Sequence, residues 1–364
     1  MFRLLIAGGG TGGHLFPALG VAEEFIRRDA DTEVLFVGTG RPVERRILEP
    51  RGFSSRKITV AGLMGKSLRD RLISLAKLPV GMIQSAFILL DFKPNLVFSV
   101  GGYASGPVGM AARLFGFNLA LHEQNSIPGL TNRLLGRLAG LIFISFESAR
   151  SFFPPHKTHL TGNPVRPEIE RVGEAEKTGP CGVLNLFVMG GSQGAHAINE
   201  AMVEAVRILS RQGVEVSITH QTGTADRDRV ARAYQDTKLS CEVMDFIQDI
   251  IQSYEKADLI VSRAGALTVS EVAASGRAAI FIPLPAADNH QEKNAMMLVE
   301  AGAAEVIRQS DLTPELLAEK ITDYVNDRET VRGMGRKARQ AARLNAAREI
   351  ARICLDRWGN ETKE

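Results

Sequence analysis

A glycine-rich turn between a short apolar run and a helix-like segment occurs once in each half of this sequence. In the first half, the run 2–7 leads into Gly8-Gly9-Gly10-Thr11-Gly12-Gly13-His14. In the second half, the run 184–189 leads into Gly190-Gly191-Ser192-Gln193-Gly194. Such a turn leaves backbone N–H groups free at the positive end of a helix, which favours a phosphate or diphosphate. Two such turns predict two nucleotide-binding-like domains facing each other across a cleft. An enzyme that joins two diphosphate-bearing substrates fits them better than one that holds a single dinucleotide.

Apolar runs alternate with helical segments along both halves, which is typical of a doubly wound α/β fold with a parallel sheet. The predicted strands are 2–7, 33–38, 96–100, 119–122, 141–146, 184–189, 215–220, 241–245, 259–262 and 278–282. The predicted helices include 17–28, 195–210 and a long final helix over 331–358. The sequence therefore predicts two Rossmann-like domains.

The segment Gly162-Asn163-Pro164-Val165-Arg166-Pro167 marks the expected domain boundary, because its prolines and glycine interrupt regular structure. We expect a first domain over 1–162, a second over 163–340, and a C-terminal helix over 341–364 that returns to the first domain.

Composition limits the function classes. The 44 lysines and arginines nearly balance the 41 aspartates and glutamates, so the net charge is +3, and nothing in the pattern indicates nucleic acid. Cys181, Cys241 and Cys354 are widely spaced, which argues against disulfide or zinc frameworks and makes a reducing cytoplasm the default. We expect no signal peptide, and no apolar run reaches the ~18 residues that a spanning helix needs.

In the first half, two further polar segments follow predicted strands, where α/β sheets bind ligands. They are the turn 101–107 and the run His122-Glu123-Gln124-Asn125. The first glycine turn lacks the lysine of a Walker A loop, so that class is excluded. Two interpretations stay open for it: a diphosphate cradle with His14 near a reacting hydroxyl, or a tight turn with His14 as a polar residue at the helix start.

In the second half, the segment 262–271 also follows a strand and opens a helix. Thr268 and the first amides of that helix could hold phosphate, and Glu271 could hold ribose hydroxyls or only complement the helix dipole. The loop 283–291 follows the next strand, and Asp288, Asn289, Gln291 and Asn294 are suited to sugar hydroxyls. The D-x-D strings at 29–31 and 226–228 are interpreted as solvated helix ends, so no metal site is predicted.

Seven segments occur in an order that resembles the family 28 glycosyltransferases of peptidoglycan synthesis. These segments are 9–14, 101–107, 122–125, 162–166, 190–194, 266–271 and 288–291. The resemblance implies a two-domain GT-B enzyme that is inverting and independent of metals and cofactors. It implies transfer of GlcNAc from UDP-GlcNAc to the C4 hydroxyl of the MurNAc of lipid I, giving lipid II and UDP.

The resemblance also implies roles for single residues, with His14 as the candidate general base. The Ile247 amide would read the uracil, Glu271 would hold the ribose, and Ser192 and Thr268 would hold the diphosphate. The residues implied for UDP-GlcNAc are Thr11, Gly12, Gly13, Asn125, Arg166, Ser192, Ile247, Ala266, Leu267, Thr268, Val269, Ser270, Glu271 and Gln291. Those implied for the acceptor are Gly12, Gly13, Gly102, Tyr103 and Ser105, and Met64 stands where the family often has an arginine on the acceptor side.

Because the acceptor's lipid tail stays in the bilayer, the first domain is expected to bind the cytoplasmic face of the bacterial inner membrane peripherally. Lys66, Arg69, Arg71 and Lys77 alternate with apolar residues there, which suits an anionic membrane surface; a core helix with a basic outer face is the alternative. Other cell-wall synthesis and division proteins are expected partners. The competing functions are a diacylglycerol glucosyltransferase, a UDP-GlcNAc 2-epimerase and a non-catalytic nucleotide-sugar sensor.

Overall fold

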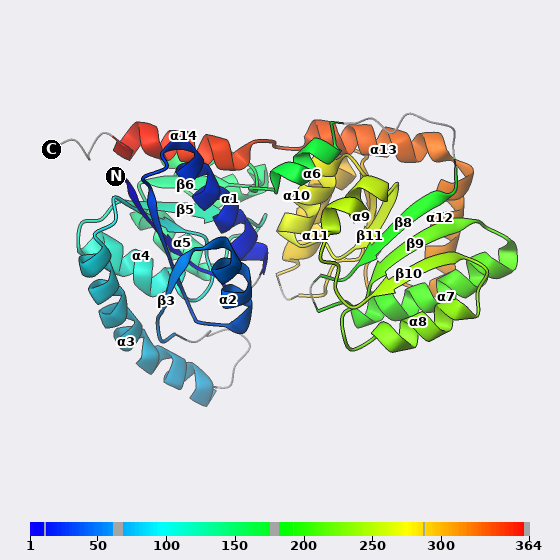
Figure 1. The fold of residues 1–364 in the computed structure, drawn as a ribbon, viewed down its shortest axis with the longest axis horizontal. Coiled ribbons are helices and arrows are strands. Elements are labelled where there is room, and N and C mark those ends of the chain that lie inside the picture. The colour runs from blue at the N-terminus through cyan, green and yellow to red at the C-terminus, as the bar shows by residue number, and fades with distance from the viewer. Residues whose placement is uncertain (11, 61–67, 175–181, 192, 287, 360–364) are drawn as a thin grey trace. The chain divides into compact units, whose positions relative to one another are not determined.

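The computed structural model describes residues 1–10, 12–60, 68–174, 182–191, 193–286 and 288–359, and only the helical backbone within 68–77. The chain forms two compact units, and each is described by itself (Figure 1). The first unit comprises Met1–Val165 together with Asn345–Glu364, and the second comprises Arg166–Leu344. The chain passes between the units a few residues after the predicted boundaries at 162 and 340.

The first unit is built on a seven-stranded parallel sheet in the order β3-β2-β1-β4-β5-β6-β7. Its strands are β1 Arg3–Ala7, β2 Glu33–Gly38, β3 Ser54–Lys57, β4 Leu96–Ser99, β5 Leu119–Glu123, β6 Leu141–Ile144 and β7 Thr158–Leu160. Its helices are α1 Gly12–Arg28, α2 Pro42–Leu48, α3 Leu68–Phe92, α4 Ser105–Leu114, α5 Leu130–Leu138 and α14 Ala346–Trp358, with short 3-10 turns at Glu49–Arg51, Glu147–Phe152 and Pro155–Lys157.

Both faces of this sheet are covered, so alternate residues of β1 enter two different cores. Leu4 and Ile6 pack with α1 and α14, whereas Leu5 and Ala7 pack with α3, α4 and α5. Ligand-binding loops therefore lie at the carboxyl ends of strands whose bodies are buried on both sides.

The second unit is built on a six-stranded parallel sheet in the order β10-β9-β8-β11-β12-β13. Its strands are β8 Leu184–Met189, β9 Val216–Gln221, β10 Ser240–Met244, β11 Leu259–Ser262, β12 Ala278–Phe281 and β13 Ala304–Val306. Its helices are α6 Pro167–Val172, α7 His196–Gln212, α8 Arg227–Gln235, α9 Ile250–Lys256, α10 Ala266–Ser275, α11 His290–Glu300, α12 Pro314–Asn326 and α13 Arg328–Ala341.

The predicted fold class of two doubly wound parallel sheets is confirmed, and the ten predicted strands all occur. The prediction missed β3, β7 and β13. Each lies at the edge of its sheet, and β3 is exposed along its whole length. An edge strand pairs on one side only and can form without a continuous apolar run, so hydrophobic pattern reveals the edge strand β10 but not these three.

The prediction of one long final helix over 331–358 is wrong. The structure has α13 and α14, separated by an extended Ala342 and by Asn345 in a left-handed conformation at φ +58°. The two helices bury their apolar faces in different cores: α13 contributes Val331 to the second unit, and α14 contributes Ile350 and Trp358 to the first. The helix is interrupted at this point because the chain passes from the second unit to the first between α13 and α14.

Candidate active site

The two glycine turns of the first unit lie against each other, because β1 and β4 are neighbours and both turns follow the carboxyl ends of these strands. A Cβ on Gly8 would lie 2.5 Å from the Gly101 carbonyl oxygen, and one on Gly102 would lie 2.9 Å from the Gly9 carbonyl oxygen. All four glycines have positive φ angles. Only glycine therefore allows these backbones to come so close.

The Ser105 hydroxyl bridges the backbones that lead into the two turns. It lies 2.8 Å from the Ala7 carbonyl oxygen and 2.7 Å from the Gly101 carbonyl oxygen, and the residue is fully buried. These contacts give Ser105 a structural role, and the acceptor contact that the resemblance implies stays a prediction. Tyr103, by contrast, is exposed at the second of these turns.

Gly12 and Gly13 open helix α1 and keep some exposure to solvent. The first amides of a helix have no intrahelical acceptor, so this end of α1 can receive an anionic group. Thr11, which was expected beside them, lies outside the described residues.

His14 lies in the first turn of α1, partly exposed, with its Nδ1 3.1 Å from Gln124 Oε1. Burial lowers the pKa of His14, and interactions with the Gln124 side chain and the Val100 carbonyl oppose that shift only in part. The ring is therefore neutral at neutral pH, which is the form that a general base needs.

Glu123, the nearest alternative base, is held by its own loop. Its carboxylate accepts hydrogen bonds from the Asn125 amide at 2.8 Å, the Asn132 Nδ2 at 2.8 Å and the Gly129 amide at 3.3 Å. Burial raises the pKa of Glu123 despite these bonds. The run 122–125 is therefore mostly buried. Asn125 was expected to contact the donor, and its Nδ2 lies 3.3 Å from Glu123 Oε1.

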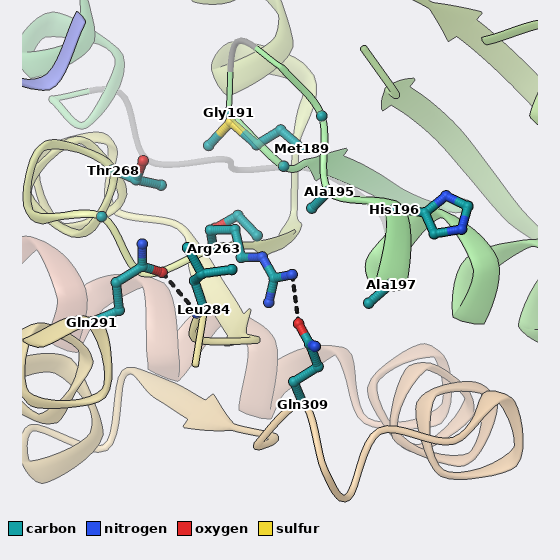
Figure 2. A pocket seen from close by; sticks show the side chains of 14 residues that line it. Met189, Gly191, Ala195, His196, Ala197, Arg263, Thr268, Leu284, Gln291 and Gln309 are labelled. Carbon is teal, nitrogen blue, oxygen red and sulfur yellow. Dashed lines mark hydrogen bonds between the residues drawn. The ribbon is translucent and has the colours of Figure 1, made fainter. Parts of the chain in front are cut away.

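The second unit contains a cavity of about 580 Å³ at the carboxyl ends of β8 and β11 (Figure 2). The cavity is lined by Met189, Gly190, Gly191, Gly194, Ala195, His196, Ala197, Ser262, Arg263, Gly265, Thr268, Leu284, Gln291 and Gln309. Of the predicted donor residues, Thr268 and Gln291 line it. Ser192 lies outside the described residues.

The N-terminus of α10 opens onto this cavity. Gly265 caps the helix with no side-chain hydrogen bond, so the amides of Ala266, Leu267 and Thr268 have no intrahelical acceptor. The helix dipole adds positive potential at the same place. This end of the helix is therefore suited to a diphosphate.

The next residues of α10 are less suited to contact the donor. Val269 is fully buried and its amide donates to the Gly265 carbonyl, while the Ser270 hydroxyl donates to the Ala266 carbonyl at 3.0 Å. These polar groups make hydrogen bonds within the helix, and the donor contacts that the resemblance implies for the two residues stay predictions.

Arg166 and Glu271, both predicted for the donor site, meet across 105 residues of sequence. Arg166 Nη2 donates to Glu271 Oε1 at 2.8 Å, and the Tyr254 hydroxyl donates to Glu271 Oε2 at 3.1 Å. Burial is the largest single influence and lowers the pKa of the Arg166 guanidinium, but the charge and the hydrogen bond of Glu271, with smaller effects from Tyr254 and Glu168, together outweigh it, and the net shift is upward. The carboxylate is buried beside the arginine, and lone pairs are left on each of its oxygens for hydroxyl donors.

The Ile247 amide, predicted to read a uracil, already has an acceptor. It donates to Gln221 Oε1 at 3.0 Å, and Gln221 Nε2 donates to the Gly191 carbonyl at 3.0 Å. Gln221 therefore links the segment at Ile247 to the second glycine turn, and a nucleotide base that bound this amide would have to displace the Gln221 oxygen.

Sequence reasoning missed three polar residues of this region: Gln221, Arg263 and Gln309. Arg263 Nη2 donates to Gln309 Oε1 at 2.7 Å, and the Leu284 amide donates to Gln291 Oε1 at 2.9 Å (Figure 2). Gln221 ends β9 and Arg263 directly follows β11. A polar residue at the carboxyl end of a strand was the available signal for both. Nothing in the local sequence indicates Gln309.

Of the other sugar-reading candidates, Asn294 is buried and its Nδ2 donates to the Ala264 carbonyl at 3.3 Å. Asp288 accepts from His290 Nδ1 at 2.6 Å, and Asn289 adopts a left-handed conformation before α11. Asp288 and Asn289 thus shape the loop before α11, and Asn294 joins α11 to the segment at Ala264.

Within the described part of the chain, no group of three or more histidine, cysteine, aspartate or glutamate side chains is arranged to hold a metal ion. In the same residues, no helix combines the length and apolarity required to cross a membrane.

Gly194→Ala is expected to disrupt the second glycine turn. Gly194 has a φ of +74°, and a Cβ there would lie 1.8 Å from the Thr222 carbonyl oxygen, which is backbone and cannot rotate away. A left-handed alanine alone costs about 1–2 kcal/mol, so the clash should lower the free energy of unfolding by more than that. Thermal unfolding and calorimetry with UDP measure both effects.

Gly213→Ala is the matched control, because Gly213 has a φ of +71° with nothing within 4 Å of the added Cβ. This variant should lose only the free energy of unfolding that a left-handed alanine costs, and it should retain the wild-type affinity for UDP. Equal losses in the two variants would contradict the close packing inferred for the turn at Gly194.

Each unit has a parallel, doubly wound sheet with glycine turns at the carboxyl ends of its strands, and in the second unit an uncapped helix end opens onto the cavity. These features define a two-domain protein of the GT-B fold. The N-terminal domain model of glycosyltransferase family 28 matches residues 4–144, and the C-terminal domain model of that family matches residues 185–351. The chain belongs to glycosyltransferase family 28.

Curated relatives match almost the whole chain. The UDP-N-acetylglucosamine–N-acetylmuramyl-(pentapeptide) pyrophosphoryl-undecaprenol N-acetylglucosamine transferase of Geobacter sulfurreducens is 48% identical over 351 residues, with 96% of each chain covered. The enzyme of the same name from Myxococcus xanthus is 43% identical, and the match covers 100% of this chain and 96% of that one.

Solved structures agree with this assignment. MurG from Acinetobacter baumannii superposes with a TM-score of 0.79 at 32% identity, covering 98% of this chain and 100% of that chain. A UDP-GlcNAc 2-epimerase from Neisseria meningitidis superposes with a TM-score of 0.68 at 14% identity, covering 98% of this chain and 100% of that one. The epimerase likeness shows the fold alone.

Proposed function

We propose that this protein transfers GlcNAc from UDP-GlcNAc to the C4 hydroxyl of the MurNAc of lipid I, producing lipid II and UDP in peptidoglycan synthesis. The observation that carries the proposal is near-full-length identity of 43–48% to transferases of this name, joined to a helix end suited to phosphate beside the Arg166–Glu271 pair.

The second unit is the proposed donor site. The amides at the start of α10 and the Thr268 hydroxyl are suited to the diphosphate, and Glu271 to the ribose hydroxyls. As the glycosidic bond breaks, negative charge grows on the departing diphosphate. Preorganised amides and a helix dipole stabilise that charge without reorganisation at the moment of reaction.

The first unit is the proposed acceptor site. The amides of Gly12 and Gly13 are suited to a second diphosphate, together with the turn at Gly102 that packs against the first glycine turn. Tyr103 is exposed beside them. His14 accepts the proton of the attacking hydroxyl, and its neutral ring is ready to do so at neutral pH.

The direct experiment mixes purified protein, radiolabelled UDP-GlcNAc and a soluble lipid I analogue. The proposal expects label in a product that requires both substrates, with UDP released in equal amount. Conversion of UDP-GlcNAc without the analogue would favour an epimerase, and donor binding without any turnover would favour a nucleotide-sugar sensor.

We further propose that the first unit binds the cytoplasmic face of the inner membrane peripherally. Exposed apolar side chains gather on α3, α4 and α5, which pack side by side, and exposed arginines accompany them on α4 and α5. The apolar members are Val80, Ile83, Phe87, Leu90, Met110, Leu114, Leu130, Leu134 and Leu138, and the basic ones are Arg113, Arg133 and Arg137. Apolar and basic side chains together are typical of an interfacial surface.

Of the basic residues first predicted for this surface, Lys66 lies outside the described residues, and so do the side chains of Arg69, Arg71 and Lys77. Met64 also lies outside them. Contacts with other proteins of cell-wall synthesis and division stay a prediction from the family resemblance.

Arg113→Glu/Arg137→Glu is expected to weaken binding to anionic vesicles by at least about tenfold, since each basic residue near such a surface contributes about 1 kcal/mol. The loss should be largest at low salt, because salt screens exposed charges. Flotation with anionic and neutral vesicles measures it.

The control is Arg211→Glu/Arg227→Glu, which reverses two exposed charges on the second unit. Normal flotation of the Arg113/Arg137 variant, or wild-type binding that ignores lipid charge and salt, would rule out this surface as the electrostatic docking site.

A further inference from the structure

We propose that Gln124 is a positioning residue that holds the His14 ring in one tautomer, with the proton on Nδ1 and the lone pair on Nε2. The inference rests on the proposed function of His14 as the general base. It adds the residue that decides which ring nitrogen receives the proton.

The orientation of the Gln124 amide follows from its partners. Gln124 Nε2 lies 3.0 Å from the Val100 carbonyl oxygen, which can only accept a hydrogen bond. The amide nitrogen must face Val100, because a reversed amide would place two acceptor oxygens together. Gln124 Oε1 therefore faces His14 Nδ1, 3.1 Å away.

The tautomer of His14 follows in turn. An amide oxygen accepts only, so His14 Nδ1 carries the hydrogen of this bond. A neutral imidazole has one N–H, which leaves Nε2 with the lone pair. Nε2 is then the atom that takes the acceptor's proton, as the hydroxyl oxygen bonds to C1 of GlcNAc and the C1–O electron pair leaves with UDP.

His122 holds Gln124 from the other side. Gln124 Nε2 also lies 3.1 Å from His122 Nδ1, so this nitrogen accepts, and His122 Nε2 donates to the Gly162 carbonyl at 3.1 Å. Burial, with a smaller effect from His14, lowers the pKa of His122 to about 4, although the bond to Gly162 opposes it. His122 therefore stays neutral at neutral pH and keeps accepting from the amide.

The neighbouring charge does not disturb this chain of bonds. Glu123, on the same strand as His122, gives its carboxylate to Asn132 and to the backbone amides of its own loop. The orientation passes from Gly162 through His122 and Gln124 to His14 without a charged member. When His14 becomes protonated, its Nδ1–H bond to Gln124 becomes charge-assisted and stabilises the imidazolium.

The first test is a ¹⁵N NMR spectrum of the ring nitrogens of His14 in the wild-type protein without substrates. We expect one protonated Nδ1 and one unprotonated Nε2. A proton on Nε2 would overturn the proposal whatever the activity of the protein, so this outcome is separate from a failure of the transferase assay.

The second test is Gln124→Met, which keeps the length of the side chain and removes both of its polar atoms. The loss of a hydrogen bond to a charged group lowers a rate by about ten- to hundredfold. We therefore expect kcat to fall by that factor, while the KM for UDP-GlcNAc stays within twofold. The ring spectrum should then show both tautomers.

Gln124→Glu supplies the pH readout. A carboxylate still accepts from His14 Nδ1, but its charge favours the imidazolium, so the acidic limb of kcat/KM should move to higher pH than in the wild type. If Gln124 had only a structural role, its replacement would change the stability of the protein and leave the pH of this acidic limb unchanged.

Gln84→Met is the matched control, since Gln84 is a glutamine of the same unit whose Oε1 accepts from the Thr59 amide at 2.6 Å. It should keep kcat, the pH profile and the His14 tautomer. Retention of the Nδ1–H tautomer and of kcat in Gln124→Met would overturn the proposal.

Discussion

Replacing His14 with alanine is expected to lower kcat by about 10²–10⁴-fold and to leave the affinity for UDP-GlcNAc unchanged. Removal of a positioned base leaves the acceptor hydroxyl to lose its proton to water, while the donor pocket in the second unit loses nothing. Single-turnover assays with the lipid I analogue measure the first quantity, and calorimetry measures the second.

His156→Ala is the control for this prediction, because His156 is exposed in a 3-10 turn of the same unit. It should retain the wild-type kcat. If His14→Ala stays within a few fold of the wild type, His14 is only a polar residue at the start of α1 and the base is another group.

The pH dependence of the wild type checks the same assignment. Because burial lowers the pKa of His14, its base form persists to lower pH than in an ordinary imidazole. The acidic limb of kcat/KM, which reports the free enzyme, should lie below the usual histidine value of about 6.5. A limb above that value would exclude His14 as the group responsible.

Replacing Glu271 with glutamine is expected to weaken UDP binding by about ten- to hundredfold. Hydrogen bonds to a carboxylate contribute about 1.5–3 kcal/mol, and the neutral amide has one acceptor atom in place of two. The change also leaves the Arg166 guanidinium without its anion at 2.8 Å, so the second unit should lose stability as well.

Calorimetry with UDP and thermal unfolding separate these two effects, when the variant is compared with Glu168→Gln. Glu168 is exposed and pairs with Arg171 at 3.2 Å on α6, so its amide variant should change neither quantity appreciably. If Glu271→Gln lowers stability but keeps the wild-type affinity for UDP, the carboxylate only neutralises Arg166 and takes no part in donor binding.

Local sequence was enough to predict most of the fold. Buried strands such as 184–189 and 259–262 are continuous apolar runs, and the glycine turns at Gly8 and Gly191 need backbone angles that glycine adopts freely. Three of the four edge strands, β3, β7 and β13, and the break between α13 and α14 escaped prediction. They depend on what packs beside the chain, and no local pattern records that.

The same division holds for the site. Sequence alone indicated most segments of the candidate site, because these segments follow strand ends and each glycine turn opens a helix, but it gave no sign of Gln309. Only the tertiary structure decided what those side chains do. It buried Ser105 beneath the turns, joined Arg166 to Glu271 and oriented Gln124 between His14 and His122. The physical reason is that a buried hydrogen-bond donor needs an acceptor, and the fold supplies that acceptor from a segment far away in the sequence.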